Sequence, residues 1–160
     1  MDKILNDGFA ALGIMPDAEA VGRLKTYYEY LEERNRVMNL TAISGAEDVA
    51  RLHFLDCAAL LTVCDFADKK VIDVGTGAGF PGMVLKIVQP DMDITLLDSL
   101  NKRIDFLSEL CARLKLENVQ CVHARAEEIS EERRAAYDIA VSRAVARLAP
   151  LEDNIDAMLG

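Results

Sequence analysis

The 160-residue sequence predicts an α/β fold: a parallel sheet with helices on both faces, preceded by a helical extension. Residues 1–66 show only helical spacing of apolar residues. From residue 67, short runs rich in β-branched residues alternate with helical patterns, and the first run leads through a glycine-rich turn into a helix. We therefore divide the chain into an N-terminal helical extension, residues 1–66, and a sheet-containing core, residues 67–160.

The extension is predicted to hold three helices, over residues 2–12, about 18–37 and about 45–63. The third helix carries His53 and Asp56, which share one of its faces. A lone His beside an Asp is more often a structural hydrogen-bonding pair than a catalytic dyad, and no Ser or Cys nucleophile motif accompanies it. We therefore prefer the structural interpretation for this pair.

The core is predicted to contain four strands separated by helices. Such alternation implies right-handed crossovers and a parallel sheet. A sheet of only four strands would leave one edge strand poorly covered, so the fold is expected to lack C-terminal strands. Strands are expected at 71–74, 94–97, 119–122 and 137–141, and helices at 83–88, from about 100, and over 151–160.

Glycines alternate directly after the first strand, in the pattern Asp73-x-Gly75-x-Gly77-x-Gly79. Bare backbone beside a helix N-terminus suits a phosphate or nucleoside ligand. The dinucleotide fingerprint G-x-G-x-x-G fails when counted from Gly75, because its third glycine position falls on Phe80. It fits only when counted from Gly77, two residues late, and then uses Gly77, Gly79 and Gly82.

Acidic residues follow the next two strands. Asp98 ends the second strand, 23 residues after Gly75, where a carboxylate can accept hydrogen bonds from both ribose hydroxyls of a nucleoside. Ala126 and Glu127 follow the third strand and could reach an adenine ring. A glycine turn with an acidic strand end predicts a nucleoside-binding site.

The net charge of −9 argues against a nucleic-acid binder, because phosphate contacts need cations. Basic residues nevertheless cluster locally, and each cluster taken singly is typical of a solvated helix face. The four cysteines form no C-x-x-C pair and no metal-ligand spacing, there is no signal peptide and no membrane-spanning run, and we expect free thiols in a reducing cytoplasm. The clusters are Arg34 with Arg36, Lys102 with Arg103, Arg133 with Arg134, and Arg143 with Arg147.

Six motifs occur in order over residues 30–148 and together resemble the RsmG (GidB) family of bacterial methyltransferases, which act on guanine N7 in small-subunit (16S) ribosomal RNA. The resemblance implies a Rossmann-like fold with S-adenosylmethionine as cofactor, and 16S rRNA or the small ribosomal subunit as partner. It implies no metal and no membrane, and we expect a monomer. The motifs are Asn39–Ile43, His53–Cys57, Asp73–Gly82, Leu97–Ser99 with Lys102-Arg103, Arg125–Glu127 and Ser142–Ala146.

The resemblance also implies roles for matched residues. Asp98 would bind the ribose, Ala126 and Glu127 would frame the adenine, and Gly75 and Phe80 would border the methionine and ribose end. Arg143 would lie at the cofactor or guanine side, His53 and Asp56 could shape the guanine side, and no catalytic base is assigned. The expected cofactor-binding residues are Asp73, Gly75, Gly77, Gly79, Phe80, Asp98, Ser99, Ala126, Glu127 and Arg143.

Three alternatives remain open. A nicotinamide-dependent oxidoreductase would use the later glycine triplet for pyrophosphate and Asp98 for ribose. A non-catalytic module would bind the cofactor or RNA without methyl transfer, and a methyltransferase could act on a small molecule. After Leu148 the chain departs from the family, which would continue with a helix and a Gly-Gly-containing strand pair. We expect neither here, although residues 151–160 have a helical pattern.

Overall fold

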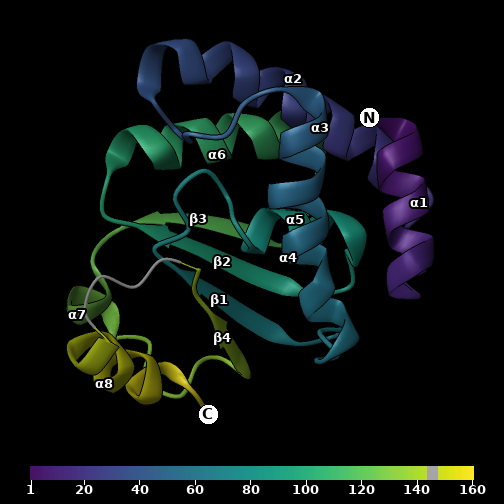
Figure 1. The fold of residues 1–160 in the computed structure, drawn as a ribbon. Coiled ribbons are helices and arrows are strands. Elements are labelled where there is room, and N and C mark those ends of the chain that lie inside the picture. The colour runs from purple at the N-terminus through teal and green to yellow at the C-terminus, as the bar shows by residue number, and fades with distance from the viewer. Residues whose placement is uncertain (144–147) are drawn as a thin grey trace.

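The computed structural model describes residues 1–143 and 148–160, the latter without the side chains of 148–152. Helices and strands alternate in the core as predicted (Figure 1). In chain order the elements are α1 (Asp2–Leu12), α2 (Ala20–Met38), α3 (Ala46–Asp48), η1 (Val49–Leu55), α4 (Asp56–Ala58), η2 (Ala59–Thr62), β1 (Lys70–Val74), α5 (Gly82–Val88), β2 (Asp93–Asp98), α6 (Asn101–Leu114), β3 (Val119–His123), α7 (Ala126–Ile129), β4 (Ile139–Val141) and α8 (Leu148–Met158).

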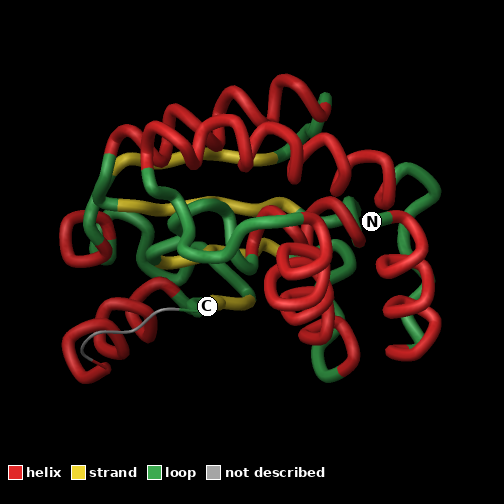
Figure 2. The backbone as a smooth tube through the Cα atoms, turned by 45° about the horizontal axis from the view of Figure 1, so that its top comes forward, coloured by secondary structure: helices red, strands yellow, loops and turns green. Residues whose placement is uncertain are grey.

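The four described strands form one parallel sheet in the order β3-β2-β1-β4 (Figure 2). Val71 in the central strand β1 is paired with Ile94 of β2 on one side and with Ile139 of β4 on the other. Along the chain, β2 and then β3 are added on one side of β1, and β4 is added on its other side. This reversal opens a crevice at the carboxyl ends of the strands, the usual ligand position in such sheets.

Both faces of the sheet are covered by helices, which confirms the predicted α/β architecture (Figure 1). Val71 and Leu96 belong to a hydrophobic cluster that includes residues of α5, α6 and the N-terminal helices. Ile72 and Leu97 point to the opposite face and pack in a second cluster with residues of α7 and α8. Burial on both faces explains why the strands have continuous apolar sequences.

The third predicted helix is continuous helix from Ala46 to Thr62, but its middle turn, η1, is π-helical. Apolar spacing did not predict this widened turn. Such turns shift the backbone hydrogen-bonding register and often occur at functional sites. The widened turn matters for the site described below, which includes side chains of η1 and one of its backbone carbonyl groups.

The C-terminal part differs from expectation in two ways. β4 covers Ile139–Val141 rather than 137–141, because the N–H of Tyr137 donates to Met158 O and Tyr137 forms an isolated bridge with Leu159. The helical pattern over 151–160 is confirmed by α8, which begins at Leu148 and packs beside α7, so the family-based expectation that no helix follows Leu148 is wrong. Residues 144–146 of the last motif, and Arg147, lie outside the described residues.

Candidate functional site

A hollow of about 330 Å³, here called the rim hollow, lies at the carboxyl ends of β1, β2 and β3. Each of these neighbouring parallel strands contributes one wall, formed by the end of the strand or by the segment that directly follows it. Five of the predicted cofactor-binding residues line it: Gly75, Asp98, Ser99, Ala126 and Glu127. Val74, Leu97, Ala124 and Arg125, which were not predicted as binding residues, complete the lining.

The glycines of the turn differ in what surrounds them. Gly75 and Gly77 have φ of 71° and 59°, and a Cβ on either would meet no heavy atom within 4 Å. A Cβ on Gly79 would come within 2.5 Å of the Tyr27 hydroxyl, and one on Gly82 within 2.7 Å of Asp73 Oδ2. Only the first two glycines therefore leave open space beside the backbone, whereas the last two permit close packing. The crowding at Gly79 disfavours the dinucleotide alternative, in which this second glycine must let the pyrophosphate approach the backbone.

Asp73 lies behind the turn and is fully buried. Its Oδ2 accepts hydrogen bonds from the Thr76 hydroxyl at 2.7 Å and the Gly82 N–H at 2.8 Å, while Oδ1 has no partner. Burial raises the pKa of this carboxyl to about 7, against the opposing effect of the two hydrogen bonds. Asp73 thus ties the turn to the start of α5, and it does not line the rim hollow.

The Asp98 carboxylate is 3% exposed and is held by three donors. Its Oδ1 accepts from Leu100 N–H at 2.9 Å, and its Oδ2 accepts from Gly77 N–H at 2.8 Å and from Arg103 at 3.5 Å. A carboxylate has about four lone-pair positions, so one further hydrogen bond can form without rearrangement. A second can form if the long Arg103 contact gives way. The residue therefore fits a diol such as ribose.

Phe80 is the centre of an aromatic stack and does not line the rim hollow. The His53 ring lies 4.0 Å from it at an interplanar angle of 8°, and the Tyr27 ring lies on it at 5.6 Å and 14°. Phe80 is only 6% exposed. The stack fixes η1 against the end of the glycine turn.

Arg143, just after β4, joins the predicted substrate-side residues into one network. One guanidinium nitrogen lies 2.8 Å from His53 Nδ1, and the other donates to Leu52 O at 2.6 Å and to Asp56 Oδ2 at 3.1 Å. His53 and Asp56 are therefore connected through Arg143. His53 Nε2 lies 2.7 Å from the hydroxyl of Thr41, a residue that sequence reasoning did not select.

The network fixes the protonation state of His53. Burial, and then the Arg143 charge, lower the pKa of the imidazole to about 4, although Asp56 opposes the shift. The ring is thus neutral near pH 7. Because Arg143 can only donate, Nδ1 is the acceptor and the proton lies on Nε2, facing Thr41 Oγ1. Both ring nitrogens are occupied, so His53 has no free lone pair for a general base.

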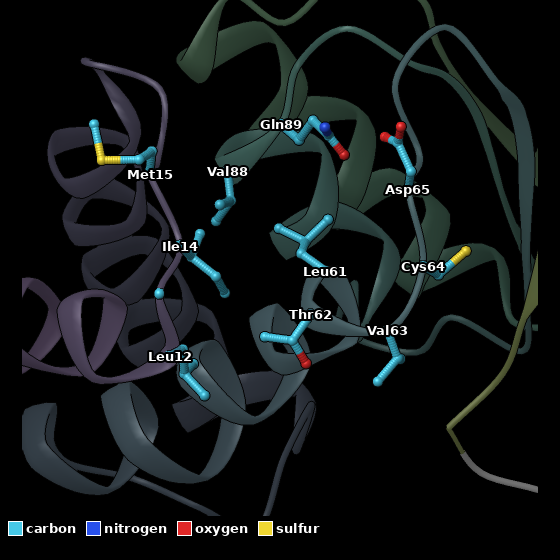
Figure 3. Close-up of a pocket in the computed structure, with 11 residues that line it drawn as sticks. Leu12, Ile14, Met15, Leu61, Thr62, Val63, Cys64, Asp65, Val88 and Gln89 are labelled. Atoms are coloured by element: carbon cyan, nitrogen blue, oxygen red, sulfur yellow. The ribbon is translucent and has the colours of Figure 1, made fainter.

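A larger hollow of about 640 Å³ lies at the opposite edge of the sheet, between the end of α1, η2 and the end of α5 (Figure 3). Its lining mixes apolar and polar groups, and Met15 and Val63 within it are 94% and 80% exposed. Asp65 is the one charged residue among its described lining residues. The hollow lies at the amino ends of the strands, away from the glycine turn and from Asp98, because η2 precedes β1 and α5 ends before β2 begins. Size alone therefore does not identify the nucleoside site.

Within 1–143 and 148–160, no three His, Cys, Asp or Glu side chains lie together in a metal-binding arrangement. No helix in the same ranges has the length and apolar character needed to cross a membrane. All four cysteines are free thiols.

Comparison with known proteins places the site in a family. The ribosomal RNA small subunit methyltransferase G of Mesoplasma florum is 47% identical over 146 residues, which are 91% of this chain and 60% of that protein. A Clostridium botulinum protein of the same name is 47% identical over 82% of this chain and 56% of its own length. The chain thus spans little more than half the length of these relatives.

Solved structures show the same fold at low identity. A putative S-adenosyl-L-methionine-dependent methyltransferase from Methanococcus maripaludis superposes with a TM-score of 0.62 at 18% identity, over 82% of this chain and 57% of that one. The family GidB, rRNA small subunit methyltransferase G, matches residues 21–159. The chain therefore belongs to the GidB family of ribosomal RNA small subunit methyltransferases.

Proposed function

We propose that this protein methylates N7 of a guanine in 16S ribosomal RNA, using S-adenosylmethionine held in the rim hollow. One observation supports the proposal most: the Asp98 carboxylate and the open backbone of Gly75 and Gly77 meet at adjacent strand ends. An adenosyl ligand needs this combination, with an acceptor for ribose beside a wall that has no side chains. Family membership supports methyl transfer to small-subunit RNA.

The lining residues divide the adenosyl group between them. Asp98 would accept hydrogen bonds from the ribose hydroxyls, and Ala126 and Glu127, at the far wall, would border the adenine. The Gly75 backbone would border the end that carries the sulfur. S-adenosylmethionine, when bound, supplies a methyl group on a positively charged sulfur.

No general base is needed for this reaction, because guanine N7 already has a free lone pair. Alignment of N7 with the breaking carbon–sulfur bond can supply most of the acceleration. The neutral, fully engaged His53 supports this mechanism, since it offers no proton acceptor. We propose that Arg143 and His53 act as positioning residues that hold η1 as the guanine-side wall.

The nicotinamide alternative receives no support from the glycine turn. In the fingerprint counted from Gly77, pyrophosphate binding needs open backbone at the second glycine, Gly79, where a Cβ would meet the Tyr27 hydroxyl. We further propose that the protein works as a monomer in the cytoplasm, where its RNA substrate is made and where its free thiols are stable.

The test is incubation of the protein with radiolabelled S-adenosylmethionine and unmodified bacterial 16S rRNA or small subunits. We expect label in the RNA, released as 7-methylguanine after hydrolysis, and at one mapped nucleotide. Label at another atom of guanine would overturn the N7 assignment. Binding of S-adenosylmethionine and RNA without transfer would support a non-catalytic module.

A further inference from the structure

A second hollow lies near the rim, between the carboxyl end of α2 and the amino end of α6. This α2–α6 groove has a volume of about 270 Å³. It shares no lining residue with the rim hollow. Its lining residues are Tyr30, Arg34, Met38, Lys102, Asp105 and Phe106.

The floor of the groove is aromatic, but its rings are covered. Tyr30 and Phe106 stack on each other at 5.0 Å and 2°, and they are 8% and 2% exposed. The Arg113 guanidinium lies over the Tyr30 ring, 4.1 Å from its centroid. No ring face is left for a nucleotide base, so the groove can act on a ligand only through its charged rim.

The rim of the groove holds two cations without acidic partners. Among the described residues, the Arg34 side chain has one hydrogen-bond partner, the Met38 sulfur at 3.5 Å, and the exposed Lys102 has no hydrogen-bond or ion-pair partner. Asp105 is the one acid in the lining, and it accepts from Asn101 at 3.3 Å. Elsewhere on the surface, arginines such as Arg51 and Arg134 pair with a glutamate one turn away. Arg34 and Lys102 thus leave the groove with two cations against the single carboxylate of Asp105.

The groove lies on the same side of the molecule as the rim hollow. α6 begins at Asn101, directly after the Asp98–Leu100 segment, and Arg103 beside Lys102 contacts Asp98 itself. The carboxyl end of α2 lies over this amino end of α6, at the left of Figure 1, where the chain also passes from β3 to α7. A strand bound in the groove would therefore lie close to the proposed cofactor site.

We propose that the α2–α6 groove binds the phosphate backbone of the RNA strand that presents the target base, with Arg34 and Lys102 as the phosphate contacts. This inference rests on the proposed function and names the surface that its substrate uses. A guanidinium and an ammonium held on two rigid helices suit phosphate oxygens. Such contacts position the strand and do not read its sequence. Met38 is the one apolar side chain of the lining that is not buried, whereas a peptide helix would need several apolar anchors spaced along the groove.

The experiment measures 16S rRNA affinity by filter binding at NaCl concentrations from about 50 to 200 mM. It compares wild type with Arg34→Ala, Lys102→Ala and the double variant. The matched control is Lys69→Ala, which removes one exposed, unpaired cation just before β1, at the other end of that strand. Arg34→Lys and Lys102→Arg keep the charge, and they test whether any loss of RNA affinity comes from the lost charge or from a change in the fold.

Each lost phosphate contact lowers the slope of log affinity against log salt by about 0.7 to 0.9, which is about a 5- to 8-fold loss of affinity at 0.1 M salt. We expect this loss from each alanine variant, an approximately multiplicative loss in the double variant, and recovery in the charge-keeping variants. Lys69→Ala should stay within about twofold of wild type. Calorimetry should show the same S-adenosylmethionine affinity for all variants.

The proposal is overturned if the alanine variants bind RNA as Lys69→Ala does, or if wild type does not bind 16S rRNA. Equal losses in the charge-keeping and alanine variants would also overturn it, because they would indicate a packing defect. If the protein transfers methyl groups to RNA but its groove variants bind RNA normally, the groove proposal fails and the proposed function stands. If RNA binding depends on the groove but no methyl transfer occurs, the groove proposal stands and the proposed function fails.

Discussion

Replacement of Arg143 by alanine tests the network that fastens η1 to the end of β4. The variant removes the donor from the buried His53 Nδ1, which costs about 1 to 3 kcal/mol when no partner replaces it. It also removes an ion pair with Asp56, but that side chain is 64% exposed, so the pair contributes only about 0.2 to 1 kcal/mol. Water can replace the bond to Leu52 O, because Leu52 is half exposed. The expected loss of unfolding free energy is therefore roughly 1 to 4 kcal/mol.

Urea unfolding followed by far-ultraviolet circular dichroism measures this loss, since the chain has no tryptophan. Arg134→Ala is the matched control: its ion pair with Glu131 is exposed on both sides, and its loss should change stability by less than about 0.5 kcal/mol. Arg143→Lys keeps the charge but not the forked geometry, so its stability should fall between wild type and alanine.

A second readout separates the network from general packing. Arg143 contributes to lowering the pKa of His53, so in Arg143→Ala that pKa should rise from about 4 towards its ordinary value. The chain has only two histidines, so the resonances of His53 can be followed individually in an NMR titration. Methyl transfer should also fall sharply. Stability equal to that of Arg134→Ala with an unchanged His53 pKa would refute the network, and normal turnover would remove Arg143 from the site.

Three further predictions follow from buried groups and from the turn. The pKa of His53 is lowered from 6.5 to about 4, so the contribution of the buried neutral ring to stability is complete above pH 6.5 and is lost as the pH falls towards 4. The urea midpoint of wild type should therefore be lower at pH 5 than at pH 7. The difference between the two midpoints should be smaller in His53→Gln. The pKa of Asp73 is raised from 3.8 to about 7, so the contribution of its protonated carboxyl to stability is complete below pH 3.8 and is lost as the pH rises through 7. Asp73→Asn should therefore gain stability relative to wild type over that pH range. A stability difference between the two proteins that stays constant with pH would contradict the buried carboxyl. Gly82→Ala should destabilise the fold by about 1 to 3 kcal/mol in a urea titration, because its Cβ would contact Asp73 and Leu96. Gly77→Ala should cost about 1 to 2 kcal/mol through backbone strain alone. A Gly82→Ala variant as stable as wild type would contradict the packing described for the turn.

The sheet and the rim were predictable from sequence because their signals are local. Three strands, the glycine turn and Asp98 each follow from a few consecutive residues whose pattern has one structural interpretation. Because the strands are parallel and alternate with helices, the carboxyl ends of β1, β2 and β3 lie at one edge of the sheet. The residues predicted to contact ribose and adenine come together there.

Side-chain direction and distant contacts could not be predicted in this way. Strands buried on both faces lack alternation, so the pattern did not reveal that Asp73 points behind the turn and Phe80 into a stack. Arg143 and His53 are 90 residues apart in sequence, and their contact depends on how η1 lies across the end of β4. The approach of Arg34 to Lys102 likewise arises only when α2 packs on α6.

Calorimetric titration with S-adenosylmethionine tests the central claim, that the rim hollow holds an adenosyl sulfonium donor, most directly. Wild type should bind this donor and should not bind NADH. Asp98→Ala should weaken donor binding about 100-fold, because two charge-assisted hydrogen bonds worth about 3 kcal/mol together are lost, while Lys69→Ala should bind as wild type does. Binding of NADH alone, or unchanged donor affinity in a folded Asp98→Ala variant, would contradict the claim.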